Sequence, residues 1–565
     1  MTTFNEFAYK RPDINHIKSN INNLIDKFDK TTSIDEQLEY IDEINKHRNQ
    51  FDTMWNIASI RHSIDTKDAF YEKENNFFDT NLPEFESAVD AFYKKVINAS
   101  NKTALKEKIG QQFFSLAELK MKSFDTKIMD ELKLENKLKS DYTKLRSSAV
   151  INFEGEERNL SAMIPFMEST DRTLRKKAYL AFWDFFAQNE DKFDKIYDDL
   201  VKVRHKMAQK LGFKNYIEMG YARMLRTDYS AKDVERFREL VVKYIVPVAE
   251  KLRQKQAKRL GLEALEAYDM GCKYQSGNAT PKGDPDWIVS NGKKMYDELS
   301  PETSTFFNFM LDRNLLDLVN KKGKAGGGYC TYIPDEKSPF IFSNFNGTAG
   351  DIDVLTHEAG HAFQVFESRS FQMPEYNWPT MEACEIHSMS MEFLTWPWME
   401  SFFKEDVDKY KYTHLGGGIL FMPYGVMVDH FQHWVYENPH ASPAERKKAW
   451  LEMEKTYRPS FKGESIPYLA TGGFWQKQSH IFETPFYYID YTLAQICAFQ
   501  FWKRSQDDAN LAFKDYLRLC RAGGSKSFLE LVEYANLKSP FVEEAFADTI
   551  QSVDDYLEAV DDSSF

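Results

Sequence analysis

The sequence has few cysteines and no long apolar run. Five cysteines occur in 565 residues, and none belongs to a Cys-x-x-Cys pair of the kind used in metal or redox chemistry. No uncharged apolar stretch reaches the length of about 18 residues that a membrane helix needs, and no apolar segment follows a basic start near Met1. These absences favour a cytoplasmic protein without a membrane partner. We expect reduced, mostly buried thiols at Cys272, Cys330, Cys384, Cys497 and Cys520.

The sequence also lacks an excess of positive charge. Its formal net charge is -14 at pH 7, whereas nucleic-acid binding draws its affinity from clustered Lys and Arg. A nucleic-acid partner is therefore not expected. Hydrophobic residues make up 42% of the chain and charged residues 28%, which predicts a sizeable core beneath a well-solvated surface.

The amino-terminal third has the spacing of amphipathic helices. A run of apolar residues from Ile14 to Phe28 falls on one face, and Asp13 is placed to cap the helix. A second stripe begins at Ile34, where Ser33 and Glu36 predict a reciprocal capping box. Similar stripes continue to about residue 145, as a bundle of antiparallel helices requires. We interpret this region as a packing scaffold.

Breaks in the helical pattern divide the chain. Segment 151–157 predicts a small hairpin, and Gly and Pro cluster at 276–286 in a predicted loop between subdomains. After three consecutive glycines, residues 329–333 and 340–345 are predicted to be paired strands. We expect a mainly α fold with an amino-terminal helical region at 1–150, a helical middle region at 151–275 and a catalytic region at 276–565. The small sheet should lie next to the helix that follows it.

That next helix carries the most informative motif. Residues 356–364 read T-H-E-A-G-H-A-F-Q and contain His-Glu-x-x-His. His357 and His361 are one helical turn apart and differ by about 40° in azimuth, so both imidazoles can reach one ion. Glu358 points beside that ion and can take a proton from a zinc-bound water. The motif predicts a catalytic zinc site, and the alternative is a helix with two buried histidines.

A catalytic zinc site needs a third protein ligand. Residues 381–393, M-E-A-C-E-I-H-S-M-S-M-E-F, offer Glu382, Glu385 and Glu392, which lie within about 80° of one another if the segment is helical. One carboxylate can complete the zinc shell while another accepts a His N–H and fixes its tautomer. Spacing alone does not choose among the three, and a solvated acidic face is the alternative.

Taken together, these motifs resemble the oligoendopeptidase F-type enzymes, which are relatives of thimet oligopeptidase. In that family a Glu downstream of the second motif His is the third zinc ligand, followed by x-x-Ser and a further Glu. Glu385, Ser388 and Glu392 match this pattern. The resemblance implies one Zn²⁺ per chain, bound by His357, His361 and Glu385, with Glu382 and Glu392 as supporting carboxylates.

The resemblance extends to the carboxyl-terminal part of the chain. Family members carry a His followed by a Tyr-rich run whose side chains donate to the oxyanion of the tetrahedral intermediate. Here the run P-F-Y-Y-I-D-Y spans 485–491, and the resemblance implies His480, Tyr488 and Tyr491 in this role. Tyr487 could exchange roles with either tyrosine, and an aromatic helix face packed in the core is the alternative. Gln364 replaces a further His found in the thimet branch.

The family resemblance implies a large helical shell whose two halves enclose a deep substrate channel. We therefore predict a zinc-dependent endopeptidase that hydrolyses internal peptide bonds of short oligopeptides, with water activated by zinc and Glu358. Strand 340–345 is a candidate edge on which an extended peptide could pair, although a purely structural role is equally compatible. The alternatives are a helical metallocarboxypeptidase or a catalytically weak peptide-binding protein. The sequence leaves the oligomeric state open.

Overall fold

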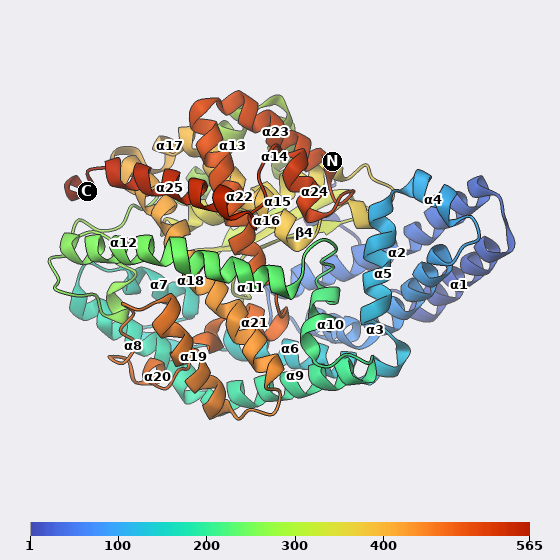
Figure 1. Cartoon of the computed structure of the whole chain (residues 1–565), viewed down its shortest axis with the longest axis horizontal. Helices are drawn as coiled ribbons and strands as arrows, with labels where there is room; N and C mark the ends of the chain where they lie inside the picture. The colour runs from blue at the N-terminus through green and yellow to red at the C-terminus, as the bar shows by residue number, and fades with distance from the viewer. Residues whose placement is uncertain (1) are drawn as a thin grey trace.

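The computed structural model describes residues 2–565, and Figure 1 shows helices along the whole chain with two small sheets. Helices account for 71% of the residues and strands for 4%, which confirms the predicted mainly α fold. Across the described residues, every helix is too short or too polar to cross a membrane.

Most of the amino-terminal helices lie to the right in Figure 1. Asp13 caps the first of them by accepting a hydrogen bond from the backbone N–H of His16 at 3.0 Å. Ser33 caps the second, but the Glu36 carboxylate accepts from the hydroxyl of Thr31 instead of the backbone of Ser33, so the predicted capping box is only half formed. The helices are α1 (Ile14–Lys30), α2 (Ile34–Ile64), α3 (Ala69–Ile97), α4 (Lys102–Ile109), α5 (Gln111–Ser123) and α6 (Met129–Ser147).

The middle of the chain begins with the predicted hairpin. Strands β1 (Ile151–Phe153) and β2 (Glu156–Arg158) are antiparallel, and Gly155 makes the turn with φ of 79°. The helices that follow are α7 (Leu160–Met167), α8 (Arg172–Gln188), α9 (Glu190–Lys210), α10 (Tyr216–Arg223), α11 (Ala231–Leu240) and α12 (Val246–Arg259).

A three-stranded sheet precedes the motif helix. As predicted, β4 (Tyr329–Ile333) pairs antiparallel with β5 (Ser338–Phe345), and the shorter β3 (Leu316–Val319) adds a parallel strand on the other side of β5. The strand order is β3-β5-β4. The suggestion that residues 340–345 form a free edge for a peptide is therefore wrong, because both edges of β5 are already paired. Helices α13 (Pro285–Leu299) and α14 (Pro301–Asp312) come before the sheet.

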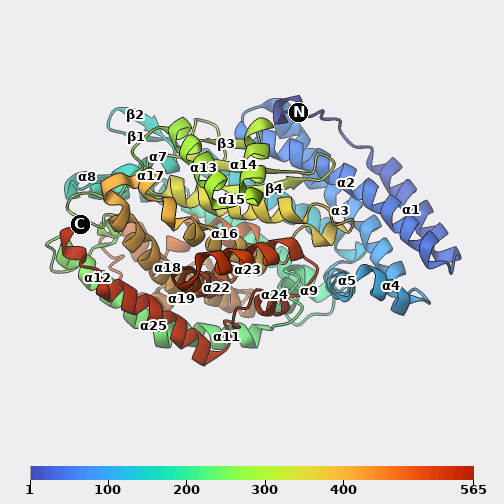
Figure 2. The same ribbon diagram turned by 90° about the horizontal axis from the view of Figure 1, so that it is seen from above.

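Three helices form the centre of the carboxyl-terminal region. Helix α16 (Met381–Leu394) packs against both α15 (Gly350–Ser368) and α22 (Tyr488–Asp507), and Figure 2 shows it between them. Nearly every residue of α16 is buried. The remaining helices of this region are α17 (Glu400–Phe403), α18 (Val407–Glu437), α19 (Pro443–Tyr457), α20 (Pro467–Ala470), α21 (Ser479–Glu483), α23 (Ala509–Ala522), α24 (Phe528–Tyr534) and α25 (Glu543–Ala559).

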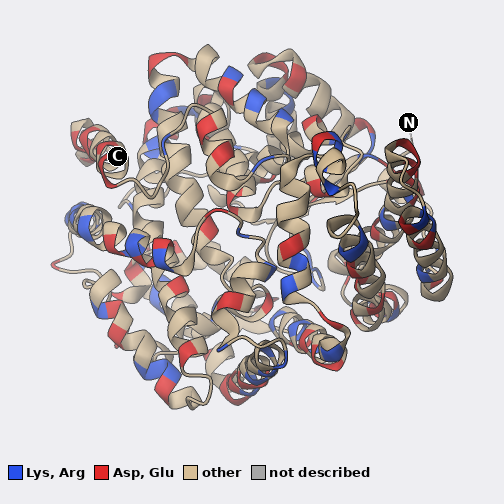
Figure 3. Ribbon diagram, turned by 45° about the vertical axis from the view of Figure 1, so that its right-hand side comes forward, with Lys and Arg blue, Asp and Glu red and all other residues tan. Residues whose placement is uncertain are grey.

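The carboxyl-terminal helix returns to the middle of the chain. Helix α25 lies along α12, and Lys251 and Lys255 of α12 pair with Asp554 at 2.6 Å and Glu558 at 2.8 Å (Figure 2). Figure 3 shows Lys and Arg interspersed with Asp and Glu along the outer helices, so the side seen there has no uniformly basic surface of the kind that binds nucleic acid.

Candidate active site

The candidate site lies where α15 packs on α16. His357 and His361 are one turn apart on α15, and Glu385 faces them from α16. Gly360 permits this close packing, because a Cβ at that position would lie only 2.6 Å from the carbonyl oxygen of His387 on α16. The motif glycine thus determines how closely the third carboxylate approaches the two imidazoles.

The three predicted ligands converge on one point. Oε2 of Glu385 lies 3.2 Å from Nε2 of His357 and 3.4 Å from Nε2 of His361. Side-chain exposure is 20% for His357, 12% for His361 and 1% for Glu385, so the cluster is reached from the imidazole side. Two imidazole nitrogens and a carboxylate oxygen at this spacing fit one ion bound at about 2 Å from each atom.

Glu392 orients His357. Its Oε1 lies 2.7 Å from Nδ1 of His357, so this nitrogen donates and Nε2 keeps a free lone pair. Its Oε2 lies 2.7 Å from Nε2 of His414, whose Nδ1 accepts from Nε1–H of Trp396 at 3.1 Å. Because Trp can only donate, neutral His414 carries its proton on Nε2 and donates it to Glu392. Burial raises the pKa of Glu392, but the two histidines outweigh it and hold that pKa below its usual value.

The structure does not bring Glu382 to the ligands. Its buried side chain lies one turn before Glu385 and belongs to a charge cluster with Asp490 and Arg226. Arg226 pairs with Asp490 at 2.8 Å, and this ion pair links α22 to the segment after α10. Burial, together with the negative charge of Asp490, raises the pKa of Glu382 well above its usual value. Glu382 therefore lies behind the site and not at the predicted ligands.

Two hydroxyl groups orient Glu385. The hydroxyl of Ser388 donates to Oε2 at 2.8 Å, and the hydroxyl of Tyr487 donates to Oε1. Burial and the negative charge of Glu385 raise the pKa of Tyr487 well above its usual value, so its hydroxyl keeps its proton. Among the adjacent tyrosines, Tyr487 is therefore the one that holds the third predicted ligand.

Glu358 lies beside the two histidines without a partner. The residue is 6% exposed, and its Oε2 makes no hydrogen bond to the described part of the chain. Burial raises its pKa, and the neighbouring His357 and His361 partly offset this effect. A buried carboxylate oxygen without a partner carries a desolvation cost. Its place beside the three ligand atoms fits the presence of a metal ion with water.

His480 presents one defined tautomer. Nε2 of Gln478 donates to its Nδ1 at 2.7 Å, and the hydroxyl of Tyr424 donates to Oε1 of Gln478 at 2.9 Å, which fixes the amide orientation. Neutral His480 therefore carries its proton on Nε2, which lies 3.1 Å from the hydroxyl of Tyr491. Burial lowers the pKa of His480 to about 4, so the ring is neutral near pH 7.

The predicted aromatic residues gather around His480. The ring centroids of Tyr487, Tyr488 and Tyr491 lie 5.4, 4.9 and 5.5 Å from that of His480. His480, Tyr488 and Tyr491 line one cavity together with Glu392. Tyr491 is the tyrosine that shares a hydrogen bond with His480, whereas Tyr487 faces Glu385.

Comparisons with known proteins identify the family of this chain. A model of the peptidase M3 N-terminal domain matches residues 4–124, and a model of peptidase family M3 matches residues 165–283 and 296–551. The chain belongs to peptidase family M3. This membership confirms the resemblance inferred from the sequence motifs.

Several relatives of this M3 chain are oligopeptidases. It is 24% identical over 373 residues to the oligoendopeptidase F homolog of Borreliella burgdorferi, covering 64% of this chain and 61% of that protein. It is 24% identical over 274 residues to the group B oligopeptidase PepB of Streptococcus agalactiae, covering 46% of this chain and 43% of that protein. The matched part thus spans less than two thirds of each of these two relatives. A solved structure of PZ peptidase A with an inhibitor is 56% identical, covers 99% of this chain and 100% of that chain, and has a TM-score of 0.98.

The M3 chain also contains site residues that sequence reasoning missed. His414 reaches Glu392 from α18, so only the fold brings it to the site, and Trp396 donates to the other nitrogen of His414. Gln364, at the position of the additional His in the thimet branch, donates to the hydroxyl of Ser368 at 2.9 Å and to the carbonyl of Asn377 at 3.0 Å. Its role here is to fix the loop between α15 and α16.

Proposed function

We propose that this chain is a zinc-dependent endopeptidase that hydrolyses internal peptide bonds of short oligopeptides. The observation that carries the proposal is the cluster of His357, His361 and Glu385 with the unpartnered carboxylate of Glu358 beside it. Two imidazoles and one carboxylate form the donor set of many zinc peptidases. Membership of peptidase family M3 and the likeness to PZ peptidase A support peptide substrates.

In this proposal His357 Nε2, His361 Nε2 and Glu385 Oε2 would hold one Zn²⁺. Bound there, the ion would lower the pKa of a water molecule and polarise the scissile carbonyl. Glu392 keeps His357 in the tautomer that leaves Nε2 free, and Tyr487 holds the carboxylate of Glu385. Partners of this kind commonly contribute 10- to 100-fold to metal affinity, in order of magnitude.

Glu358 moves the proton in this mechanism. A carboxylate whose pKa is raised by burial is a better base near neutral pH than an ordinary one. It accepts a proton from the attacking water and returns it to the leaving amine, so that one residue serves as base and then as acid. General acid–base catalysis of this kind contributes roughly 10²- to 10⁴-fold in rate.

His480 and Tyr491 would stabilise the oxyanion. The Nε2–H of His480 and the hydroxyl of Tyr491 lie 3.1 Å apart and can both donate to a negatively charged oxygen. Each such donor contributes about 3 kcal/mol to the transition state in comparable sites. Tyr488 lines the same cavity and is a third candidate donor.

An oligopeptide blocked at both ends tests the proposal. A fluorescence-quenched peptide with an acetylated amino terminus and an amidated carboxyl terminus should be cut internally by the zinc-loaded protein. Removal of zinc with a chelator should abolish cleavage, and addition of zinc should restore it. Glu358→Gln is the control for contaminating peptidases. Removal of single residues only from unblocked peptides would instead support the metallocarboxypeptidase alternative. Binding without cleavage would support a peptide-binding protein.

A further inference from the structure

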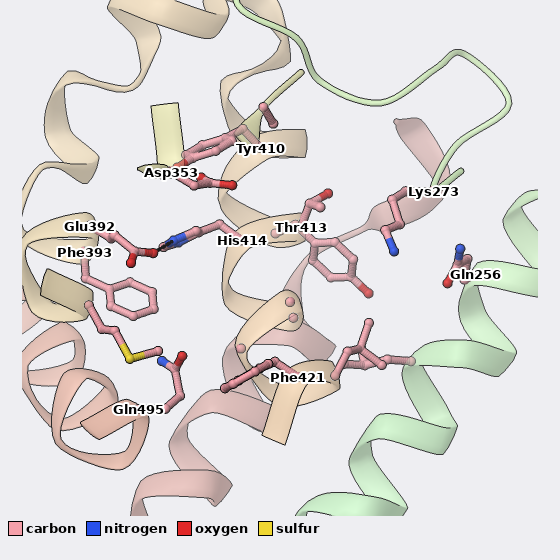
Figure 4. A pocket seen from close by; sticks show the side chains of 18 of the residues that line it. Gln256, Lys273, Asp353, Glu392, Phe393, Tyr410, Thr413, His414, Phe421 and Gln495 are labelled. Carbon is pink, nitrogen blue, oxygen red and sulfur yellow. Dashed lines mark hydrogen bonds and ion pairs between the residues drawn. The ribbon is translucent and has the colours of Figure 1, made fainter. Parts of the chain in front are cut away.

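A cavity of about 490 Å³ is lined by His480 and Tyr491 and by residues of several other helices (Figure 4). Figure 4 shows Glu392 and His414 at one end and Gln256 and Lys273 at the other. This volume falls within the range of about 300–1,000 Å³ typical of small-ligand sites. The cavity is therefore large enough to hold part of a bound peptide beside His480 and Tyr491, which also line it.

Lys273 supplies an amino group at the far end of this cavity. Its Nζ donates to the backbone carbonyl of Met270 at 2.6 Å, and in the described part of the chain it takes no part in an ion pair. Arg259, which also lines the cavity, is already paired with Asp562. Figure 4 shows the ammonium group of Lys273 pointing into the cavity.

The backbone that carries Lys273 is held in place. Its N–H donates to Oδ1 of Asn278 at 2.7 Å. Next to it, the carbonyl of Cys272 accepts from Nε2 of Gln256 at 2.7 Å. These bonds connect the loop after α12 to that helix, so the ammonium group is presented from a fixed position and not from a free surface side chain.

The walls between the two ends are apolar and open. Leu252, Leu420 and Phe421 line them together with three consecutive glycines of α18, 416–418. A Cβ added at Gly417 would meet nothing within 4 Å. Glycine inside a helix costs about 1 kcal/mol relative to alanine, and here its effect is to widen the cavity beside the helix.

The charges of the cavity differ between its ends. The end near Glu392 carries two carboxylates. Asp353 accepts a hydrogen bond from Tyr410 at 2.7 Å, and Glu392 is hydrogen-bonded to two histidines. At the far end, burial and the charge of Arg253 lower the pKa of Lys273 to about 7, and the negative charge of Glu168 only partly offsets them. A carboxylate placed beside Nζ would favour the charged form of this lysine.

We propose that Lys273 binds a carboxylate of the peptide substrate at the far end of this cavity. The carboxylate belongs either to the free end of the peptide or to an acidic side chain, and both have the same chemistry. The inference rests on the proposed peptidase function and adds to it a group that selects among peptides. An unpaired, fixed ammonium group in a cavity with apolar walls is the observation that supports it.

The test measures binding, so it does not depend on turnover. Fluorescently labelled peptides are titrated into Glu358→Gln protein, with and without Lys273→Met, and anisotropy gives the affinity. One peptide pair differs by a free or amidated carboxyl end, and a second pair differs by Glu or Gln at one internal position. We expect Lys273→Met to weaken binding of the carboxylate-bearing peptide by about tenfold and to change that of its amide partner by less than about twofold.

Controls separate this role from a structural one. Lys273→Arg should restore the preference for the carboxylate, and Lys282→Met, which removes a surface lysine from the same region, should not affect it. Gly417→Leu should weaken binding of both peptides by filling the cavity. Equal weakening of all peptides by Lys273→Met, or a preference that survives it, would overturn the proposal. A wild-type protein that binds these peptides but never cleaves them would contradict the proposed function and leave the role of Lys273 standing.

Discussion

Gly360→Ala should separate the two helices that carry the proposed zinc ligands. The added Cβ would lie 2.6 Å from the carbonyl oxygen of His387 and 2.7 Å from Cα of Ser388, both of which are backbone atoms of α16. Ordinary contact begins near 3.4 Å, so the helices must move apart by roughly 0.8 Å, several times the tolerance of about 0.2 Å for metal–ligand distances. The displacement would move Glu385 away from the two imidazoles.

The expected energies follow from the same geometry. Overpacking costs about 1–3 kcal/mol, and replacing a helical glycine with alanine returns up to about 1 kcal/mol, so the apoprotein should be destabilised by at most about 3 kcal/mol. Zinc affinity should fall at least about tenfold, as it does when partners of metal ligands are lost. A tenfold loss corresponds to about 1.4 kcal/mol, so the losses of zinc affinity and of fold stability are of similar size and have to be measured separately.

Zinc affinity is measured by competition with a chelator, and stability by urea unfolding of the metal-free protein. Gly417→Ala is the matched control, because it makes the same change inside a helix where the new Cβ meets nothing within 4 Å. This control should keep its zinc affinity and gain a little stability. If Gly360→Ala binds zinc as tightly as the control does, the account of the helix contact is refuted.

Three further predictions concern single side chains. Glu358→Gln should lower kcat by about 10²- to 10⁴-fold with no loss of bound zinc. Steady-state kinetics measures kcat and elemental analysis measures the zinc content. Nearly full activity would exclude Glu358 as the base. Tyr487→Phe removes a donor to Glu385 and should weaken zinc binding by roughly tenfold in chelator competition, whereas unchanged affinity would contradict its orienting role. For His480 the folded-state pKa of about 4 is below the ordinary value of 6.5, so only the unfolded chain binds the proton as pH falls from 6.5 to about 4. As the pH falls through that window, wild type should therefore lose up to about 3 kcal/mol of unfolding free energy relative to His480→Asn. The same pH dependence of the unfolding free energy in both proteins would show that His480 is not buried in its neutral form.

Local geometry explains which site residues the sequence could predict. The helix alone fixes the relation between His357, Glu358 and His361, because residues four apart lie on one face. Choosing Glu385 over its neighbours needed the family resemblance. Glu382 shows why, since α16 is buried on nearly all sides and its helical wheel does not reveal which face meets α15 and which faces Arg226.

Other features depend on contacts between distant segments. His414 lies on α18, and its contact with Glu392 arises from tertiary packing that no local pattern records. The four-residue strand β3 is too short to give a clear alternating pattern, and its parallel pairing makes β5 a central strand. The domain boundaries at 150 and 275 and the enclosed substrate channel stay predictions.

Anomalous diffraction at the zinc edge tests the central claim most directly. We predict, in crystals of the zinc-loaded protein, a single strong peak within about 2.0–2.2 Å of Nε2 of His357, Nε2 of His361 and a carboxylate oxygen of Glu385. Glu358 should lie beside this peak without binding it, and Glu382 should lie away from it. A peak coordinated without Glu385, or no peak between α15 and α16, would contradict the account.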